Sequence, residues 1–513
     1  MKNSRAVLLC VSILSTLLAI GCGSGNFTPP PTGVTASSHP LVAQYSIRHF
    51  RQGMTAWVEF GTDTTYGRQT SVMASSPNTP DGQPLVILVA GMRAQTMYHM
   101  RAHVTLLDGS TWVDQDQTFT TGALPTSQPL PQIKISYPAS GTLASVSPET
   151  GVELLSQQAP ANSTLLQPMV TDLQGNVLWY CPLPALPIKP MPNGDYFVNL
   201  VSEIREVDLT CKTIRSISVL AVNQSLQTNG YPFVVTQGSS LGGFHHDMLA
   251  LPNGHWIALG QTTKDFSDLP GYPGTTGVLG DVLLDIDPNG NVVWAWSAFD
   301  YLDVNRHLMG LPDWTHSNAL VYTPDGNLLL SMRNQSWILK IDYANGTGSG
   351  NILWKLGEEG DFTLLGGDPS QWFYAQHYPN LLSTNGSQAT LAIWDNGNQR
   401  LDSTGTIPCG APPFAACYSR ATMFQIDEST FVANLLWQDL PGFFSFWGGS
   451  IGVLDNGNVE FDMTDPFNTS ASQIMEVTQT DNPQTVWQMN ITGENAYRGY
   501  RIPSLYPGVA WQQ

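Results

Sequence analysis

Short hydrophobic strands alternate with polar turns along most of this chain, and beyond about residue 150 one unit recurs. Each unit has a hydrophobic strand that ends near Asp, a polar turn, and a second strand that carries Trp. The copies read VTDLQGNVLWY, LLDIDPNGNVVWAW, ILKIDYANGTGSGNILWKL, MFQIDESTFVANLLWQD and IMEVTQTDNPQTVWQM, and a sixth, EVDLTCKTIRSI, has lost its Trp. Repeated β units of this kind build radial blades. Six copies predict a six-bladed β-propeller over residues 151–513, with five or seven blades as the alternatives.

A second pattern of short alternating strands fills residues 38–122 and predicts a small β-sandwich. The order of VEFGTDTTYG, VAGMRAQTMYHMRAHV and QTFTTG resembles a fibronectin type III-like module. The Pro-rich stretch LPTSQPLPQ follows, so residues 123–150 are expected to be a linker and connection. The predicted fold class is therefore all-β, a sandwich followed by a propeller.

The N-terminus has the pattern of an export signal. Lys2 and Arg5 precede an apolar stretch over residues 6–20, which is too short for a stable membrane span. The stretch ends in LLAIGC, which resembles a bacterial lipobox. Residues 1–22 are therefore predicted to be a signal peptide whose cleavage leaves an acylated Cys22, with a plain signal peptide as the alternative. The Gly, Ser and Pro residues over 23–37 predict a flexible tether.

Composition fits a turn-rich, exported protein, and the lipobox-like motif places it in the bacterial periplasm or cell envelope. Charged residues make up only 12% of the chain, and the net charge is −19 without any run of Lys and Arg, which argues against a nucleic-acid partner. Beyond Cys10 and Cys22, four cysteines are left, and an even number in an exported protein suggests disulfides. The favoured pair is Cys409 with Cys417, whose short loop is worth about 2.5 kcal/mol in the chain-entropy account. A pair between Cys181 and Cys211 has weaker support.

Three clusters of polar residues interrupt the apolar repeat near strand starts, where propellers bind ligands at the mouth of the central channel. The first lies in GGFHHDMLALPNG, the second in DWTHSNALVYTPDGNLLLSMRNQSWILKID, and the third in WFYAQHYPNLLSTNGSQATLAIWDNGNQR. Equivalent positions in successive repeats make a shared site a better explanation than unrelated core residues. The members are His245, His246 and Asp247; Asp313, His316, Asn318, Arg333, Asn334 and Gln335; and Gln376, His377, Asp395, Asn396 and Arg400.

These motifs, together with ILWKLGEEGDF and the terminal YRGYRIPSLYPG, resemble the bacterial arylsulfotransferase family over most of residues 240–505. The resemblance implies a six-bladed propeller that moves a sulfuryl group from an aryl sulfate to a phenol without phosphoadenosine phosphosulfate. It implies that the histidine of the QH motif, His377, is the nucleophile. The supporting residues would be His316, Arg333 and the histidine of the HHD motif at His246, with His245 as the alternative.

Substrate contacts are expected from the polar neighbours of these residues, His245, Asn318, Asn334 and Gln376. Where family members commonly read SSRHQS this chain reads SMRNQS, so Asn334 replaces a histidine. That difference bears on substrate preference more than on the reaction, because His377 and Arg333 are retained.

The residue types suit sulfuryl transfer. The group carries its charge on three oxygens, so a site must mainly position and neutralise it, and Arg333 offers a permanently charged fork. Neutral imidazole is a nucleophile at physiological pH, and the accepting phenol, whose pKa is about 10, needs a base such as His316 or His246. The expected partners are a small aryl sulfate, a phenol and, through the lipid anchor, a membrane, with no cofactor; no oligomeric state follows from the pattern.

Two other readings are open. The histidines and carboxylates could hold a metal, as in a metal-dependent propeller lyase or hydrolase, although no metal-ligand set is predicted. Alternatively, a non-catalytic surface lipoprotein could bind carbohydrate or protein through its Trp-rich blades. Arg333 separates these possibilities, because sulfuryl transfer needs a fixed cation, whereas aromatic and amide residues suffice for a sugar platform.

Overall fold

The computed structural model describes residues 30–48, 50–74, 83–126, 130–137, 147–236, 243–401, 409 and 417–512. The fold is mostly β, with many antiparallel sheets. The predicted signal peptide and Cys22 lie outside the described residues. No helix within the described ranges is long and apolar enough to cross a membrane.

The N-terminal part contains two sheets that share one core. The smaller is β1-β2-β6, and the larger is β4-β3-β7-β8, with β5 beside β3 and β9 beside β7. Alternate residues of the facing strands, including Tyr45, Phe60, Ile87 and Met100, are buried together. The strands are β1 (Thr32–Ala36), β2 (Ala43–Ile47), β3 (Thr55–Gly61), β4 (Arg68–Gln69), β5 (Met73–Ala74), β6 (Leu85–Val89), β7 (Met97–Thr105), β8 (Thr111–Val113) and β9 (Gln117–Thr120).

Two segments predicted as tether and linker contain strands. The range 23–37 includes β1, which pairs with β2 from Thr32 to Ala36 and so is not flexible there. The range 123–150 includes β10 (Gln132–Ser136), which pairs antiparallel with β34, far along the chain. The alternating QIKIS sequence of β10 supplies a strand to that sheet, which a reading of Pro content alone could not reveal.

The remaining described strands form six sheets of four or five strands. Consecutive segments of the chain form consecutive sheets, except that the last strand, β35, belongs to the first sheet and the first strand, β10, belongs to the last. The sheets are β13-β12-β11-β35, β14-β15-β16-β17, β18-β19-β20-β21, β22-β23-β24-β25, β26-β30-β29-β28-β27 and β10-β34-β33-β32-β31. The bounds are β11 (Val152–Gln158), β12 (Met169–Thr171), β13 (Val177–Tyr180), β14 (Ile188–Pro190), β15 (Tyr196–Asn199), β16 (Glu203–Val207), β17 (Thr213–Ser218), β18 (Phe244–Ala250), β19 (Trp256–Leu269), β20 (Tyr272–Ile286), β21 (Val292–Ser297), β22 (Ser317–Tyr322), β23 (Leu328–Met332), β24 (Trp337–Ile341), β25 (Ile352–Leu356), β26 (Thr363–Leu364), β27 (His377–Asn385), β28 (Gln388–Asp395), β29 (Arg420–Asp427), β30 (Val432–Asp439), β31 (Ser450–Val453), β32 (Val459–Thr464), β33 (Ala471–Val477), β34 (Thr485–Thr492) and β35 (Asn495–Ile502).

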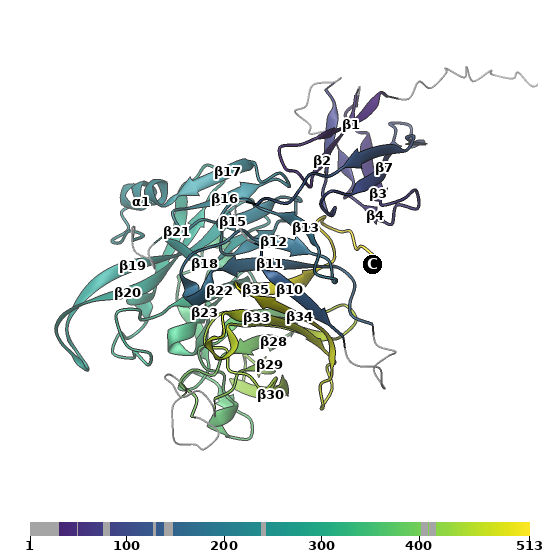
Figure 1. Cartoon of the computed structure of the whole chain (residues 1–513). Helices are drawn as coiled ribbons and strands as arrows, with labels where there is room; N and C mark the ends of the chain where they lie inside the picture. Colours follow the sequence, from purple (N-terminus) through teal and green to yellow (C-terminus); the bar gives the residue numbers. More distant parts are fainter. Residues whose placement is uncertain are drawn as a thin grey trace, which may run out of the picture.

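Helices are few among the described residues. The α-helices are α1 (Val219–Thr228) and α2 (Ala298–Tyr301), and short 3-10 helices include η1 (Pro160–Asn162), η2 (Arg333–Gln335), η3 (Ala344–Gly346), η4 (Pro369–Gln371) and η5 (Pro466–Asn468). The β19–β20 hairpin extends well beyond the rest of its sheet (Figure 1).

Each of the six sequence repeats forms two neighbouring strands at or next to one edge of a sheet, and each repeat falls in a different sheet. Examples are β20–β21 and β24–β25. At the opposite edges, β18, β22, β27, β31 and β35 contact one another in that order. The last strand, β35, joins the sheet of β11, and β10 joins the sheet of β34, so both ends of this part of the chain are tied into it.

The C-terminal tail connects the two parts of the molecule, and Figure 1 shows it running to the N-terminal sheets. The Tyr506 hydroxyl donates to Leu88 O (2.8 Å) and accepts from Ala90 N (2.7 Å), while Trp511 packs edge-on against Phe60. Arg93 adds an ion pair with Asp172 at 2.6 Å. The N-terminal sheets therefore share polar and apolar contacts with the six-sheet part.

Two disulfides are present, Cys409–Cys417 and Cys181–Cys211, each with Cα atoms 5.6 Å apart. The weaker of the two predicted pairings therefore forms as well. Two disulfides indicate an oxidising, exported environment.

Candidate functional site

The three polar clusters meet where β18, β22 and β27 begin. His246 lies in β18, His316 immediately precedes β22, and His377 opens β27. The ring centroids of His246 and His316 are 4.7 Å apart. Tyr497 of β35 lies beside two of these histidines, with its ring centroid 5.7 Å from that of His246 and 6.0 Å from that of His377. Residues spread over 250 positions of sequence thus form one cluster of rings.

The backbone turns sharply at these strand entries. Non-glycine residues with positive φ occur at His246 (53°), His316 (48°), Ser336 (51°), Ala375 (50°) and Tyr378 (47°). Each such residue costs of order 1–3 kcal/mol, and such strain persists where the surroundings over-determine it, most often at functional sites. Residues with positive φ recur beside all three clusters. This agrees with strand entries whose backbone conformation serves to position the site side chains.

His377 is held in one tautomer by Asn396. The amide nitrogen of Asn396 donates to Ser445 O (2.9 Å) and Gly448 O (3.0 Å), so its oxygen must face His377 Nδ1, at 2.7 Å. Nδ1 therefore carries the proton, and Nε2 keeps its lone pair. That lone pair accepts from Gly448 N at 3.2 Å. The atom of His377 available for attack is thus Nε2.

The surroundings of His377 also keep the ring neutral. The side chain is 1% exposed, and burial, reinforced by the positive charge of Arg333, lowers its pKa well below 6.5. An imidazole of this kind is uncharged, and hence nucleophilic, at neutral pH.

Of the two adjacent histidines, His246 lies against the other rings, whereas His245 faces Asp281. His245 Nε2 is 3.3 Å from Asp281 Oδ1; the two atoms do not meet hydrogen-bond geometry, but the negative charge of the carboxylate favours a proton on that nitrogen. His245 Nδ1 can then accept from His246 Nδ1, 2.8 Å away, and His246 keeps a lone pair on Nε2. Burial, followed by the charge of His316, lowers the pKa of His246 well below 6.5. His246 is therefore a second neutral imidazole beside His377.

His316 is paired with a carboxylate. Its Nδ1 hydrogen-bonds Asp313 Oδ2, and both side chains are partly exposed. Burial opposes ionisation of Asp313, but the charge and hydrogen bond of His316 outweigh it and lower the pKa of Asp313. The hydrogen bond to the carboxylate favours a proton on Nδ1, which leaves the lone pair of His316 on Nε2.

Arg333, in η2, is 7% exposed, and hydrogen bonds hold only some of the nitrogens of its guanidinium group. Nη1 donates to Asn334 Oδ1 (2.8 Å), and Nη2 donates to Phe446 O (3.1 Å). Burial lowers the pKa of Arg333 to about 10, so it remains a cation at neutral pH. Within the described residues its buried Nε has no hydrogen-bond partner. The group can therefore still donate to an anion.

Besides His245, the three other residues expected to contact substrate have different surroundings. Asn334 orients Arg333 and donates to Asp313 O (2.6 Å). Gln376 is fully buried, and its amide nitrogen donates to Trp337 O (2.9 Å). Asn318 donates to Gln376 O (2.7 Å). The latter two hold the β22 and β27 entries together.

Beneath the histidines is a buried charge cluster. Asp247 forms ion pairs with Lys189 (2.5 Å) and Arg498 (3.3 Å), and its second oxygen accepts from Leu320 N (2.8 Å). Burial opposes its charge, but the two cations lower the pKa of Asp247. A similar arrangement in the third cluster joins Asp395 to Arg400 and Arg420. These carboxylates are satisfied internally, so they brace the strand entries.

Sequence reasoning missed Tyr497 and the segment 445–448. Tyr497 lies in YRGYRIP, one of the motifs that carry the family resemblance, but neither spacing nor periodicity places it beside histidines 120 and 250 residues away. Burial raises the pKa of Tyr497 to about 12. Within the described residues, no group of three or more His, Cys, Asp or Glu side chains has an arrangement suited to a metal ion.

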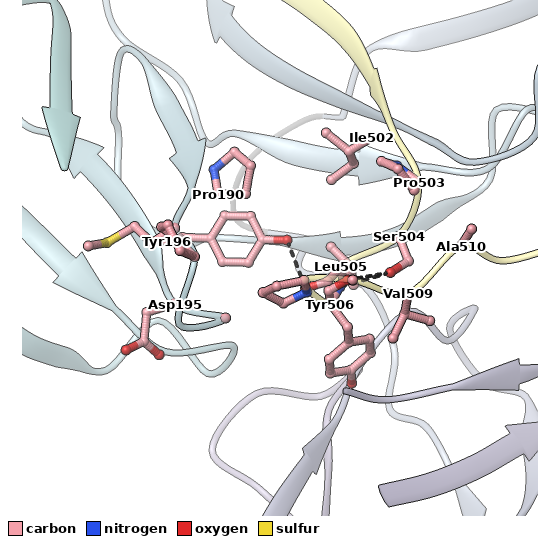
Figure 2. Close-up of a pocket in the computed structure, with 15 residues that line it drawn as sticks. Pro190, Asp195, Tyr196, Ile502, Pro503, Ser504, Leu505, Tyr506, Val509 and Ala510 are labelled. Atoms are coloured by element: carbon pink, nitrogen blue, oxygen red, sulfur yellow. Dashed lines mark hydrogen bonds between the residues drawn. The ribbon is translucent and has the colours of Figure 1, made fainter. Parts of the chain in front are cut away.

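A separate cavity of about 420 Å³ lies between β14–β15 and the C-terminal tail (Figure 2). Its lining is mostly apolar, with Tyr196 donating to Leu505 O at 3.4 Å. It contains none of the predicted site residues. The chemistry-bearing groups are gathered at the entries of β18, β22 and β27 instead.

Comparison with known proteins gives one family. Residues 143–501 match the model of the arylsulfotransferase family. No curated protein matches the chain. Similar solved structures include virginiamycin B lyase from Staphylococcus aureus (11% identity, 78% of this chain and 92% of that chain covered, TM-score 0.29) and a protein from Lactobacillus plantarum (11% identity, 67% and 82% covered, TM-score 0.34). Since the family match spans well over half of its length, the chain belongs to the arylsulfotransferase family.

Proposed function

We propose that this member of the arylsulfotransferase family moves a sulfuryl group from an aryl sulfate to a phenol through a sulfohistidine at His377. The observation that carries the proposal is the state of His377, a buried neutral imidazole whose Nε2 lone pair faces the same loop that anchors Arg333. Arg333 Nη2 and His377 Nε2 contact Phe446 and Gly448, two residues apart. A sulfate group between them would meet a nucleophile and a cation together.

In the first half-reaction, Nε2 of His377 attacks sulfur, the bond from sulfur to the aryl oxygen breaks, and the phenolate leaves with the electron pair of that bond. Arg333 neutralises the charge on the sulfuryl oxygens. Gly448 N, which donates to Nε2 in the free protein, must give up that bond and can then donate to a sulfuryl oxygen.

In the second half-reaction, the acceptor phenol loses its proton to a base, its oxygen attacks sulfur, and the bond from nitrogen to sulfur breaks. His316 is the better base, because its Nδ1 hydrogen-bonds Asp313 and its Nε2 lone pair is therefore left to accept the proton. The neutral His246, whose Nδ1 proton is directed to His245, can accept a hydrogen bond at Nε2 beside it. Asn334, in place of a histidine, leaves Arg333 with an amide partner and tunes the choice of substrate.

The test is nucleotide-free transfer from 4-nitrophenyl sulfate to a phenol, with initial rates measured over both substrates. Ping-pong kinetics are expected, and the protein incubated with donor alone should carry a sulfuryl group on the peptide that contains His377. His377→Ala should lose both half-reactions, whereas His255→Ala, which removes a histidine paired with Asp285 outside the site, should keep them. Modification of another residue, or activity without His377, would contradict the proposal.

The same proposal covers architecture and location. The six sheets are taken as the blades of a six-bladed propeller, a reading supported by the contacts of β18, β22, β27, β31 and β35 in sequence. The two N-terminal sheets are taken as a fibronectin type III-like spacer. The mature protein is taken to be anchored through an acylated Cys22.

A further inference from the structure

The segment of residues 443–449, FFSFWGG, connects β30 to β31 and is called the aromatic loop here. Phe444 is buried, whereas Phe446 and Trp447 are partly exposed. Nothing in the repeat pattern requires large aromatic side chains in this connection. Partly exposed aromatic rings held in fixed positions are a common means of binding a flat apolar group.

The aromatic loop lies against the groups that would hold the sulfate. Phe446 O accepts from Arg333, and the guanidinium carbon of Arg333 lies 5.5 Å from the centre of the Phe446 ring. Gly448 N donates to His377. Gly448 has a φ of 66°, and a Cβ there would lie 2.4 Å from Thr464 Oγ1, so the loop has little room to retreat.

The partly exposed rings of Trp447 and Phe446 are held in place by residues that pack against their buried sides. The ring of Trp447 lies nearly parallel to that of Tyr497, with 21° between the ring planes and 6.5 Å between the centroids, and the Trp447 side chain lies near Asp465. Phe446 packs on the small core formed by Phe444 and the Cys409–Cys417 disulfide. Fixed rings lose little conformational entropy when a ligand binds, which makes them effective recognition surfaces.

We infer that Trp447 and Phe446 form the surface that binds the aromatic ring of the substrates and thereby select aryl over alkyl sulfates. The inference rests on the proposed function, because it takes the sulfate to lie between Arg333 and His377. A ring attached to that sulfate then lies within reach of the aromatic loop. The ring contributes stacking and apolar contact, while the sulfate contributes charge.

Binding separates the two contributions without any transfer reaction. The probes are 4-nitrobenzenesulfonate and methanesulfonate, which share an anionic head but differ in the ring, and whose carbon–sulfur bonds are not substrates for transfer. Calorimetric titration of the full mature protein should show roughly tenfold or more tighter binding of the aryl probe. Trp447→Ala should remove most of that preference and leave methanesulfonate binding unchanged, whereas Trp447→Phe should retain it.

Trp112→Ala is the matched control, since Trp112 is a partly exposed tryptophan in β8 of the N-terminal part. If Trp447→Ala does not fold, Trp447→Leu tests the same loss of an aromatic face. Equal affinity of wild-type protein for the two probes, or an unchanged preference after Trp447 is replaced, would overturn the inference. Absence of sulfuryl transfer in wild-type protein would instead count against the proposed function. The comparison of the affinities for the two sulfonate probes could still be interpreted in that case.

Discussion

Replacing Asn396 by Ala should impair His377 more than it changes any other part of the site. Asn396 is fully buried, and its side chain makes three hydrogen bonds, to His377 Nδ1, Ser445 O and Gly448 O. It touches no substrate in the proposed mechanism. Its role would be to fix the tautomer that keeps the attacking lone pair on Nε2.

The cost can be worked out from the partners. Ser445 O also accepts from the Ser419 hydroxyl, so the substitution leaves two buried groups without a protein partner, His377 Nδ1–H and Gly448 O. At about 1–3 kcal/mol for each orphaned buried group, the free energy of unfolding should fall by about 2–6 kcal/mol. If the lost bond to Nδ1 weakens the transition state by about 1–3 kcal/mol, sulfation of the enzyme should slow roughly 5- to 150-fold.

Two measurements check this expectation. Denaturant unfolding gives the change in stability, and single-turnover release of nitrophenol at saturating donor gives the sulfation rate. The control is Asn199→Ala, because Asn199 is also fully buried and holds a backbone turn through Val201 N (2.8 Å), but lies in β15. It should lose stability and keep the sulfation rate.

A folded Asn396→Ala protein that is sulfated at the wild-type rate would refute the tautomer argument. Asn396→Asp provides a second check. Its carboxylate can still accept from Nδ1, but the negative charge raises the pKa of His377. Since the imidazolium is not a nucleophile, the acid limb of the sulfation rate should move to higher pH. An unmoved limb would show that this contact does not control His377.

Four further expectations concern single features of the molecule. Arg333→Lys should lower turnover by about 10²-fold or more with the fold intact, because a point charge cannot replace the planar fork; near-normal steady-state turnover would contradict its role. Because burial and the charge of Arg333 hold the pKa of His377 well below 6.5, the sulfation rate should stay flat as pH falls through 6.5 and should decline only at lower pH. Just below pH 6.5 His377 binds a proton in the unfolded protein but not in the folded protein. The free energy of unfolding should therefore also fall as the pH drops below 6.5. Replacing Cys409 and Cys417 by Ser should lower the free energy of unfolding by about 2.5 kcal/mol, measured with denaturant, and an unchanged value would argue against the short-loop entropy account. Mass spectrometry of the mature N-terminus should find an acylated Cys22; another N-terminal residue without lipid would reject the anchor.

The local pattern of the chain was enough to predict a mostly β fold and the pairs of adjacent strands that the repeats form. Trp-bearing repeats such as LLDIDPNGNVVWAW fall on adjacent strands because hydrophobic alternation and Asn-Gly turns act over a few residues. Charge and cysteine content pointed to an exported protein, and both expected cysteine pairings form. Short motifs also pointed to the family that the comparison identified. Each of these inferences rests on residues close together in sequence.

The arrangement of the candidate site depended on contacts between distant segments. Only the folded chain brings Tyr497 beside His246 and His377, turns His245 toward Asp281, and sets Asn396 against His377. The strand β10 likewise pairs with β34, more than 350 residues away. Periodicity reports which face of a strand is buried, but not which strand lies next to it. Neighbours, tautomers and pKa values follow from that packing, so the tertiary structure alone decided them.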